Sequence, residues 1–361
     1  MSISNEWVDE SVRCTARLSE GRLDFRVSDA TVSVHQVLAD EVGSRWSKHG
    51  LCGQKWSDSR VASSVLSLYD VLRSTLKKLS GSLEIHAVLC RRKCFKRRAV
   101  PVALDVFSWT FVSGTTGWRI QGVQADSFDP SAICRRIRRS LELPSSRRAN
   151  FAGRTMVLEG TAASVLLHEM LVHGSEWSGW VRGAKFWDLD FQAVSLCPSG
   201  RVTDDTGRCV RPVHFVEEGK LVHRPDDIGA AQYWAAPHEL APYPRFPYVL
   251  VHPRNFVPWP REFIQVSEVG HAEFCSGMIS ISIPYGLGVA KGKKVGLTGP
   301  MELLLHADSV VSCDFLPGDY SLMPGACVRN GAMLPCWTTS GAIRIELDFD
   351  LADLRLGPWR V

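Results

Sequence analysis

Short segments of alternating apolar and polar residues, separated by glycine-containing turns, dominate the second half of the chain. Three such segments are "FIQVSEVG", "GMISISIPYGLGVAKGKKVG" and "GAIRIELDF", and "RCVRPVHFVEEGKLVHRP" (208–225) is typical of a β-hairpin with "EEGK" at its turn. Alternation with a period of two indicates strands that bury one face. We therefore expect residues 151–361 to form a mostly antiparallel β domain with one conspicuous helix near its start.

The first 150 residues differ, because strand-like segments are interleaved with segments of helical period. Predicted strands are "GRLDFRVSD" (21–29), "SLEIHAVLC" (82–90) and "VPVALDVFSWTFV" (100–112). Apolar residues recur at spacings of three and four within 57–79, which predicts a helix, and a second helix is predicted over 130–143. We expect an α/β layer domain over residues 1–150, and therefore an α+β fold for the whole chain.

The length of the chain supports two domains. It has 361 residues, of which 45% are hydrophobic, whereas a single core seldom grows beyond about 250–300 residues. The segment "LPSSRRANFAGRT" (143–155) is rich in Pro, Ser, Arg and Gly and is the best candidate for the linker between the domains.

Composition also restricts location and partners. Forty-two basic against 38 acidic residues give a formal charge of +4, which is too small to require a nucleic-acid or membrane partner. No apolar run approaches the roughly 20 residues that span a bilayer, and "MSISNEWVDESV" lacks the pattern of a secretory signal. We expect a cytoplasmic protein whose 11 cysteines are mostly free thiols, with one or more available as metal ligands.

Two basic clusters, "RRKCFKRR" (91–98) and "CRRIRRSLELPSSRR" (134–148), could contact phosphates. We favour a structural explanation, in which the first is a loop between strands and the second is the solvated face of a helix, because neither cluster is accompanied by an aromatic stacking platform or a known recognition module. A non-catalytic protein that binds peptide or nucleic acid through these clusters is the alternative functional interpretation. Its binding would depend on Arg91, Arg92, Lys96 and Arg97.

The predicted helix of the second domain contains "VLLHEMLVHGSE" (165–176), in which His168 and His173 are five positions apart. In the H-E-x-x-H motif of metalloproteases the two histidines are four apart and share one helix face. On a regular α-helix, positions five apart diverge by roughly 140°. The two rings can converge only if the helix contains a π-bulge or ends between them, and Gly174 is suited to such an end.

Spacing alone leaves two interpretations of this helix open. It could be an apolar core helix with two hydrogen-bonded histidines. Alternatively, His168 and His173 could bind Zn²⁺, and the adjacent Glu169 could accept a proton from a water molecule.

Several segments in the same order resemble the TldD/PmbA family of metalloproteases. "GTAASVLLHEMLVHGSE" is similar to the family's H-E-x-x-x-H segment, which has a small-residue lead-in and a following Gly-x-Glu. "DDTGRCVRPVHFVEEGKL" (204–221) and "GHAEFCSGMISISIPYGLGVAKGKKVG" (270–296) resemble its later hairpin and strand-rich segments. "PGACVRNGAMLPCWTTSGAIRIEL" resembles its closing motif, so the resemblance covers roughly residues 150–348.

The resemblance implies a zinc peptidase. Carried over by position, it assigns His168, His173 and Cys327 as zinc ligands and Glu169 as general base. It further implies a heterodimer with a related TldE/PmbA-like subunit that lacks the metal motif, and substrates that are short or unfolded peptides. A variant specialised for one peptide natural product is a second enzymatic interpretation.

The identity of the third ligand and the shape of the substrate channel both stay open. The sequence alone leaves Cys336, Glu176, His223 and His271 as rivals of Cys327. The chain also departs from the family pattern. Val172 replaces a common glycine, and Val328, Arg329 and Ala332 change the closing motif, which puts the shape of the substrate channel in doubt.

Overall fold

The computed structural model describes strands in the first 150 residues and most of the chain after residue 154. The described ranges are 3–19, 22–38, 45–51, 81–95, 106–113, 118–125, 155–196, 204, 209–227, 230–234, 243–246, 248–298, 301–306, 310–318, 320–329, 332–347 and 354–356. The helices predicted over 57–79 and 130–143 lie outside these ranges. The division into two domains near residue 150 stays a prediction.

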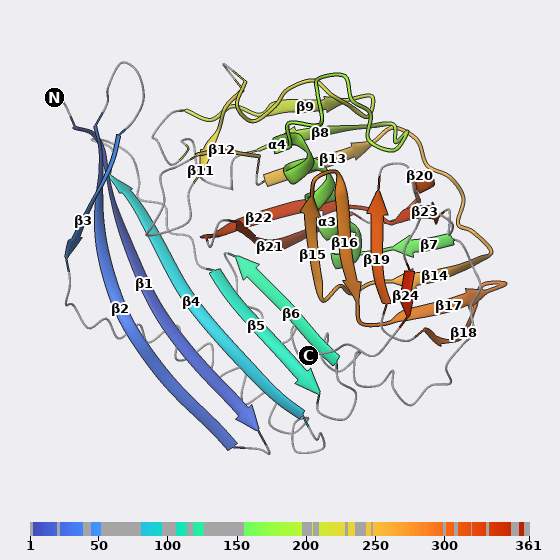
Figure 1. Ribbon diagram of the computed structural model, residues 1–361, viewed down its shortest axis with the longest axis horizontal. Coiled ribbons are helices and arrows are strands. Elements are labelled where there is room, and N and C mark those ends of the chain that lie inside the picture. Colours follow the sequence, from blue (N-terminus) through green and yellow to red (C-terminus); the bar gives the residue numbers. More distant parts are fainter. Residues whose placement is uncertain are drawn as a thin grey trace.

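Six antiparallel strands form the N-terminal sheet, in the order β3-β2-β1-β4-β5-β6. Their bounds are β1 Ile3–Ser19, β2 Arg22–Leu38, β3 Arg45–Leu51, β4 Gly81–Phe95, β5 Val106–Ser113 and β6 Trp118–Ala125. The predicted strands 21–29 and 82–90 are confirmed within β2 and β4, and the described part of 100–112 is confirmed within β5, but the prediction missed β1, β3 and β6. In Figure 1 these blue to cyan strands lie beside the rest of the molecule, and β6 contacts β21 and β22.

The structure corrects the interpretation of the first basic cluster as a loop. Strand β4 continues to Phe95, so Arg91 and Arg92 are paired through the backbone with Glu10 and Asp9 of β1. A continuous partner strand, which periodicity cannot reveal, extends β4 beyond its apolar segment. Lys96 and Arg97 lie outside the described residues.

The remaining strands form three larger sheets and one two-stranded ribbon. The first sheet has the order β10 (Lys220–Leu221), β9 (Val213–Glu217), β8 (Phe191–Ser195), β13 (Tyr248–Pro253), β22 (Ala332–Ser340), β21 (Ser321–Arg329). The second has the order β18 (Lys293–Thr298), β17 (Gly286–Ala290), β14 (Glu262–Val266), β7 (Thr155–Leu158), β23 (Ile343–Leu347), β20 (Val310–Phe315). The third is β15 (His271–Cys275), β16 (Met278–Ile283), β19 (Met301–His306), β24 (Leu354–Leu356), and the ribbon is β11 (Tyr233–Trp234) with β12 (Tyr243–Pro244).

The mostly antiparallel character of this region is confirmed, with two parallel pairs, β13–β22 and β14–β7. The predicted hairpin is also present, because β9 and β10 are joined at Glu218 and Gly219. Both turn residues have positive φ, 50° and 69°. This backbone conformation favours glycine, in agreement with the "EEGK" signal.

One helical segment lies among these sheets and follows directly from β7 (Figure 1). It consists of α3 (Thr161–His168), η1 (Glu169–His173) and α4 (Gly174–Glu176). Most of its apolar side chains, including Leu166, Leu167, Met170 and Leu171, are fully buried in the main hydrophobic core with residues from the surrounding sheets. This burial explains the nearly uniform apolar character of "SVLLHEMLV", and it holds the helix rigidly against β22.

Gly174 serves a different purpose from the predicted one. Its φ of −62° is helical, so it does not end the helix in a left-handed conformation. A Cβ at this position would instead overlap the indole ring of Trp180, which packs against the helix. The indole contacts Phe186 and Phe274 edge-to-face and thereby joins the end of the helix to the core.

Among the described residues, no helix has the length and apolar character needed to cross a bilayer.

We expect the substitution Gly174→Ala to destabilise the fold by about 1–3 kcal/mol, because the added methyl group must displace the packed indole of Trp180. Urea denaturation followed by tryptophan fluorescence would measure the change. Gly318→Ala is the matched control, since a Cβ there meets no neighbouring atom. Equal stability of the two variants would contradict the packing role of Gly174.

Candidate metal centre

The helix widens by one residue between the two histidines. Residues Glu169–His173 form a π-turn, and the backbone N–H of Gly174 donates to the carbonyl oxygen of Glu169, five residues earlier. Each residue of this wider turn rotates less than a residue of an α-helix, so positions five apart fall on one side. The rings of His168 and His173 accordingly lie 5.3 Å apart between centroids. The sequence left a bulge or a helix end open, and the structure contains the bulge.

Cys327 reaches the two histidines from a distant part of the chain. It lies in β21, 154 positions after His173, and its Sγ atom is 3.1 Å from His173 Nε2. Each of the three residues offers a ligand atom, and these atoms all lie within 4.8 Å of one another. Among the described residues, this is the cluster of histidine, cysteine and acidic side chains that could hold a metal ion.

His168 provides the clearest sign that these residues suit a metal ion. Its side chain is buried, and neither ring nitrogen has a hydrogen-bond partner within the described structure. Burial lowers the pKa of His168 well below its usual range, with further lowering by His173 and Arg245. A neutral imidazole with buried, unsatisfied nitrogen atoms is the form that coordinates a metal.

Glu169 faces the same cluster. One of its carboxylate oxygens, Oε2, lies 3.8 Å from His173 Nε2, and the residue is only 8% exposed. The carboxylate is therefore next to the nitrogen that faces Cys327. From this position it could exchange a proton with a water molecule held at the cluster.

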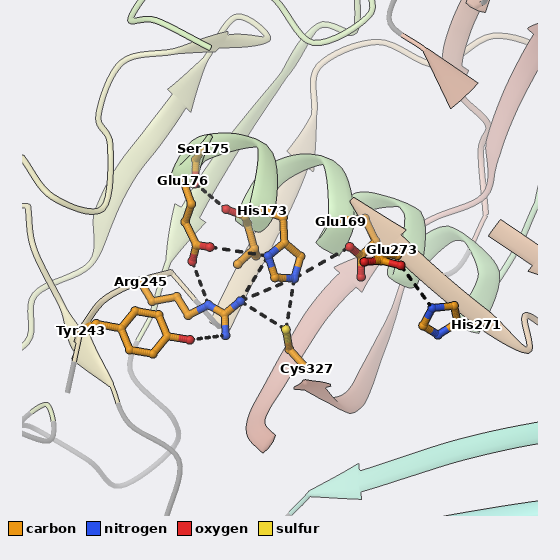
Figure 2. A network of polar contacts seen from close by, with 10 residues as sticks. Glu169, His173, Ser175, Glu176, Tyr243, Arg245, His271, Glu273 and Cys327 are labelled. Carbon is orange, nitrogen blue, oxygen red and sulfur yellow. Dashed lines mark hydrogen bonds and ion pairs between the residues drawn. The ribbon is translucent and has the colours of Figure 1, made fainter. Parts of the chain in front are cut away.

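Two further residues, Arg245 and Tyr243, complete the polar network (Figure 2). Arg245 is fully buried and donates from Nε to Glu176 Oε1 at 2.8 Å, from Nη1 to the Tyr243 hydroxyl at 3.0 Å and from Nη2 to Cys327 Sγ at 3.2 Å. Neither residue was predicted from the sequence. Arginine within the otherwise apolar "PYPRFPYVLV" was the available signal, because a charged residue is rarely buried without a partner.

The surroundings of Cys327 raise the pKa of its thiol. Burial has the largest effect and the Glu169 carboxylate adds to it, whereas the Arg245 guanidinium lowers the pKa. A thiol in such a site coordinates a metal ion only after losing its proton.

The structure does not bring the rival ligands into the cluster. His223 lies 3.7 Å from Asp227, and His271 lies 3.9 Å from Glu273 and is 66% exposed. Glu176 contacts the opposite ring nitrogen of His173, with Oε2 3.5 Å from Nδ1. Cys336 is buried in β22, and it is absent from the cluster of possible ligands.

Three solved structures resemble the chain over nearly its whole length. A protein from Thermotoga maritima described as a modulator of a DNA gyrase has a TM-score of 0.64 at 11% identity, over 97% of this chain and 95% of that one. TldE from Thermococcus kodakarensis has a TM-score of 0.59 at 9% identity, over 95% of each chain. A protein from Bacteroides thetaiotaomicron, also described as a modulator of DNA gyrase, has a TM-score of 0.52 at 11% identity, over 95% and 94%.

The chain has the fold of these proteins. The coverage includes both the N-terminal sheet and the part that carries the candidate metal ligands. No protein-family model and no curated protein matches the sequence. Structural similarity at such low identity establishes a shared architecture, and the chemistry has to be argued from the residues of this chain.

We expect the single substitutions His168→Ala, His173→Ala and Cys327→Ala each to abolish stoichiometric zinc binding, because three protein ligands are the usual minimum for such a site. Zinc content of the purified variants, measured by plasma mass spectrometry, would test this. Cys336→Ser is the control and should keep its zinc. Full zinc content in Cys327→Ala, or loss in Cys336→Ser, would show that the wrong cysteine has been assigned.

Burial of neutral His168 predicts that the metal-free protein loses stability in mild acid. Below pH 6.5 the unfolded chain binds a proton at this residue, whereas the folded chain does not, because its pKa is lowered. Above pH 6.5 His168 is neutral in both states and has no pH-dependent effect on stability. Below that pH the free energy of unfolding of the metal-free protein falls by at most about 1.4 kcal/mol per pH unit, until the folded chain also binds the proton. Urea denaturation in the presence of a chelator should show a smaller acid loss for His168→Gln than for the unsubstituted protein. An identical pH dependence in both would contradict this account.

Proposed function

We propose that the chain is a zinc-dependent peptidase and the metal-bearing, TldD-like member of the TldD/PmbA family. The observation that carries this proposal is the convergence of three ligand atoms, from His168, His173 and Cys327, beside the carboxylate of Glu169. The shared fold with TldE and the ordered sequence resemblance support the family assignment.

The donor set favours zinc. Two imidazole nitrogens and one thiolate are borderline to soft ligands, which suit Zn²⁺ better than Mg²⁺, Ca²⁺ or Mn²⁺. Catalytic zinc sites typically have three protein ligands and one position left for water or substrate. His168, His173 and Cys327 provide three such ligands. The two nearby glutamates are outside this set, because Glu169 adjoins it as a candidate base and Glu176 lies on the far side of the His173 ring.

A zinc ion in such a site supplies Lewis acidity, which polarises a carbonyl group and lowers the pKa of water to about 7. Glu169 accepts the proton of the attacking water and then returns it to the nitrogen of the leaving amine. Its Oε2 atom lies 3.8 Å from His173 Nε2, which supports this role. The buried surroundings strengthen every electrostatic interaction in the site.

The substrates proposed are short or unfolded peptides, and a peptide natural product is a candidate for a specialised member. We further propose a heterodimer with a related TldE/PmbA-like subunit that lacks the metal motif, and a cytoplasmic location. The likeness to TldE supports the partner proposal, because one fold would serve both subunits.

The substitution Glu169→Gln tests the proposed base. We expect zinc to remain bound and peptide hydrolysis to fall by about 10²–10⁴-fold, which is the usual contribution of a general base. Cleavage of a mixture of unstructured, fluorescence-quenched peptides would be measured for the chain alone and with a TldE-like subunit.

Glu273→Gln is the control for this experiment, because it removes an exposed carboxylate from the neighbouring strand β15. That variant should retain full activity. A fully active Glu169→Gln variant, or a protein without stoichiometric metal, would refute the proposed function.

A further inference from the structure

Arg245 connects three separate segments at the metal cluster. It lies between β12 and β13, and its guanidinium contacts Glu176 at the end of the helix, Cys327 in β21 and Tyr243 in β12. The same Nη2 atom also lies 3.3 Å from His173 Nδ1 and 3.5 Å from His173 Nε2. Figure 2 shows the guanidinium between the Glu176 carboxylate, the His173 ring and the Cys327 sulfur.

The contacts of Arg245 affect the orientation of His173. Arg245 Nε holds one oxygen of the Glu176 carboxylate, and the other oxygen lies 3.5 Å from His173 Nδ1. A carboxylate at one ring nitrogen of a ligating histidine is the common arrangement that fixes the ring and leaves the other nitrogen for the metal. Here the remaining nitrogen is Nε2, which faces Cys327.

Arg245 also affects the position of Cys327. Its sulfur receives a hydrogen bond from Arg245 Nη2 at 3.2 Å, so the guanidinium fixes the position of the sulfur. The fork of the guanidinium directs Nε and Nη2 in fixed, different directions. One rigid group can therefore hold Glu176 and Cys327 at the same time, whereas the single ammonium group of a lysine could not.

A buried arginine beside a metal site has an opposing effect, because it repels a cation. The formal charges nevertheless balance: the carboxylates of Glu169 and Glu176 and the Cys327 thiolate carry three negative charges, Arg245 carries one positive charge, and a divalent ion supplies the remaining two. Burying ions without such compensation is costly. The fully buried guanidinium with its several polar contacts is thus part of the charge and geometry of the site.

We propose that Arg245 is a positioning residue of the metal centre. It orients His173 indirectly, through Glu176, and it orients Cys327 by a direct hydrogen bond, so that both ligands face the ion before it binds. This inference concerns the same site as the proposed function and rests on its metal assignment. Arg245 itself touches neither substrate nor metal in this account.

The test is a titration of the metal-free protein with Co²⁺, which reports thiolate coordination through its sulfur-to-metal charge-transfer absorption. We expect Arg245→Met to weaken Co²⁺ binding by about 10–100-fold, as loss of an outer hydrogen-bond partner usually does. The charge-transfer band should also change in shape or intensity. Competition with a chelator of known affinity would provide the dissociation constants.

Two more variants separate positioning from charge. Arg245→Lys keeps the positive charge without the fork, and we expect it to bind Co²⁺ nearly as weakly as Arg245→Met. The double variant Arg245→Met, Glu176→Gln removes one positive and one negative charge, so the net charge of the cluster is unchanged, and it should also bind weakly. Wild-type affinity in either variant would overturn the proposal, as would equal or tighter binding by Arg245→Met.

Arg344→Met is the matched control, because Arg344 is an ion-paired arginine bound to Asp314 in a strand pair outside the cluster. It should bind Co²⁺ like the unsubstituted protein. Circular dichroism of each variant identifies any that fails to fold. If Arg245→Met fails to fold, Arg245→Lys still decides the test.

The experiments distinguish failure of the Arg245 proposal from failure of the proposed peptidase function. A wild-type protein that binds Co²⁺ and cleaves no peptide would refute the peptidase and leave the role of Arg245 to be decided by the dissociation constants. A wild-type protein that binds no metal would overturn both.

Discussion

The widened turn of the helix at Glu169–His173 is the constraint on which the site depends. A regular α-helix would direct His168 and His173 to different sides and would leave Cys327 opposite only one of them. The five-residue hydrogen bond from Gly174 to Glu169 removes this divergence. π-Turns are rare, occur mostly as single-turn bulges within α-helices, and are frequently located at functional sites.

The surrounding fold supplies what this turn requires. Leu166, Leu167, Met170 and Leu171 are fully buried, and this apolar contact stabilises a helix that its own hydrogen bonds would hold less well. Trp180 packs over Gly174 and secures the end of the segment. His168 and His173 lie on the packed helix and Cys327 lies in β21, so regular elements bring the three proposed ligands together.

Electrostatics then determine which chemistry the cluster can carry out. His168 has no hydrogen-bond partner in the described part of the chain, and burial keeps it neutral. Glu169, Glu176 and Arg245 bring opposite charges together beside the buried Cys327, where interactions between ions are strong and unpaired charges are costly. The divalent cation proposed for this site would balance these charges.

Much of this organisation could be predicted from the sequence. Period-two alternation predicted the antiparallel strands, and helix geometry showed that "HEMLVH" needs a bulge or an end. Periodicity could not reveal β1 or the full length of β4, because those strands depend on partners distant in sequence. The choice of Cys327 over Cys336 came from the resemblance, since no local rule places a cysteine 154 positions away beside His173. Arg245 was missed for the same reason, because its partners come from three separate segments.

X-ray absorption at the zinc edge of the zinc-loaded protein identifies the ligand atoms of the proposed site. We expect a first shell with one sulfur at about 2.3 Å and nitrogen ligands at about 2.0–2.1 Å. A shell of nitrogen and oxygen alone would show that Cys327 is not a ligand, and two sulfurs would show that Cys336 joins it. Either result would contradict a site built from His168, His173 and Cys327.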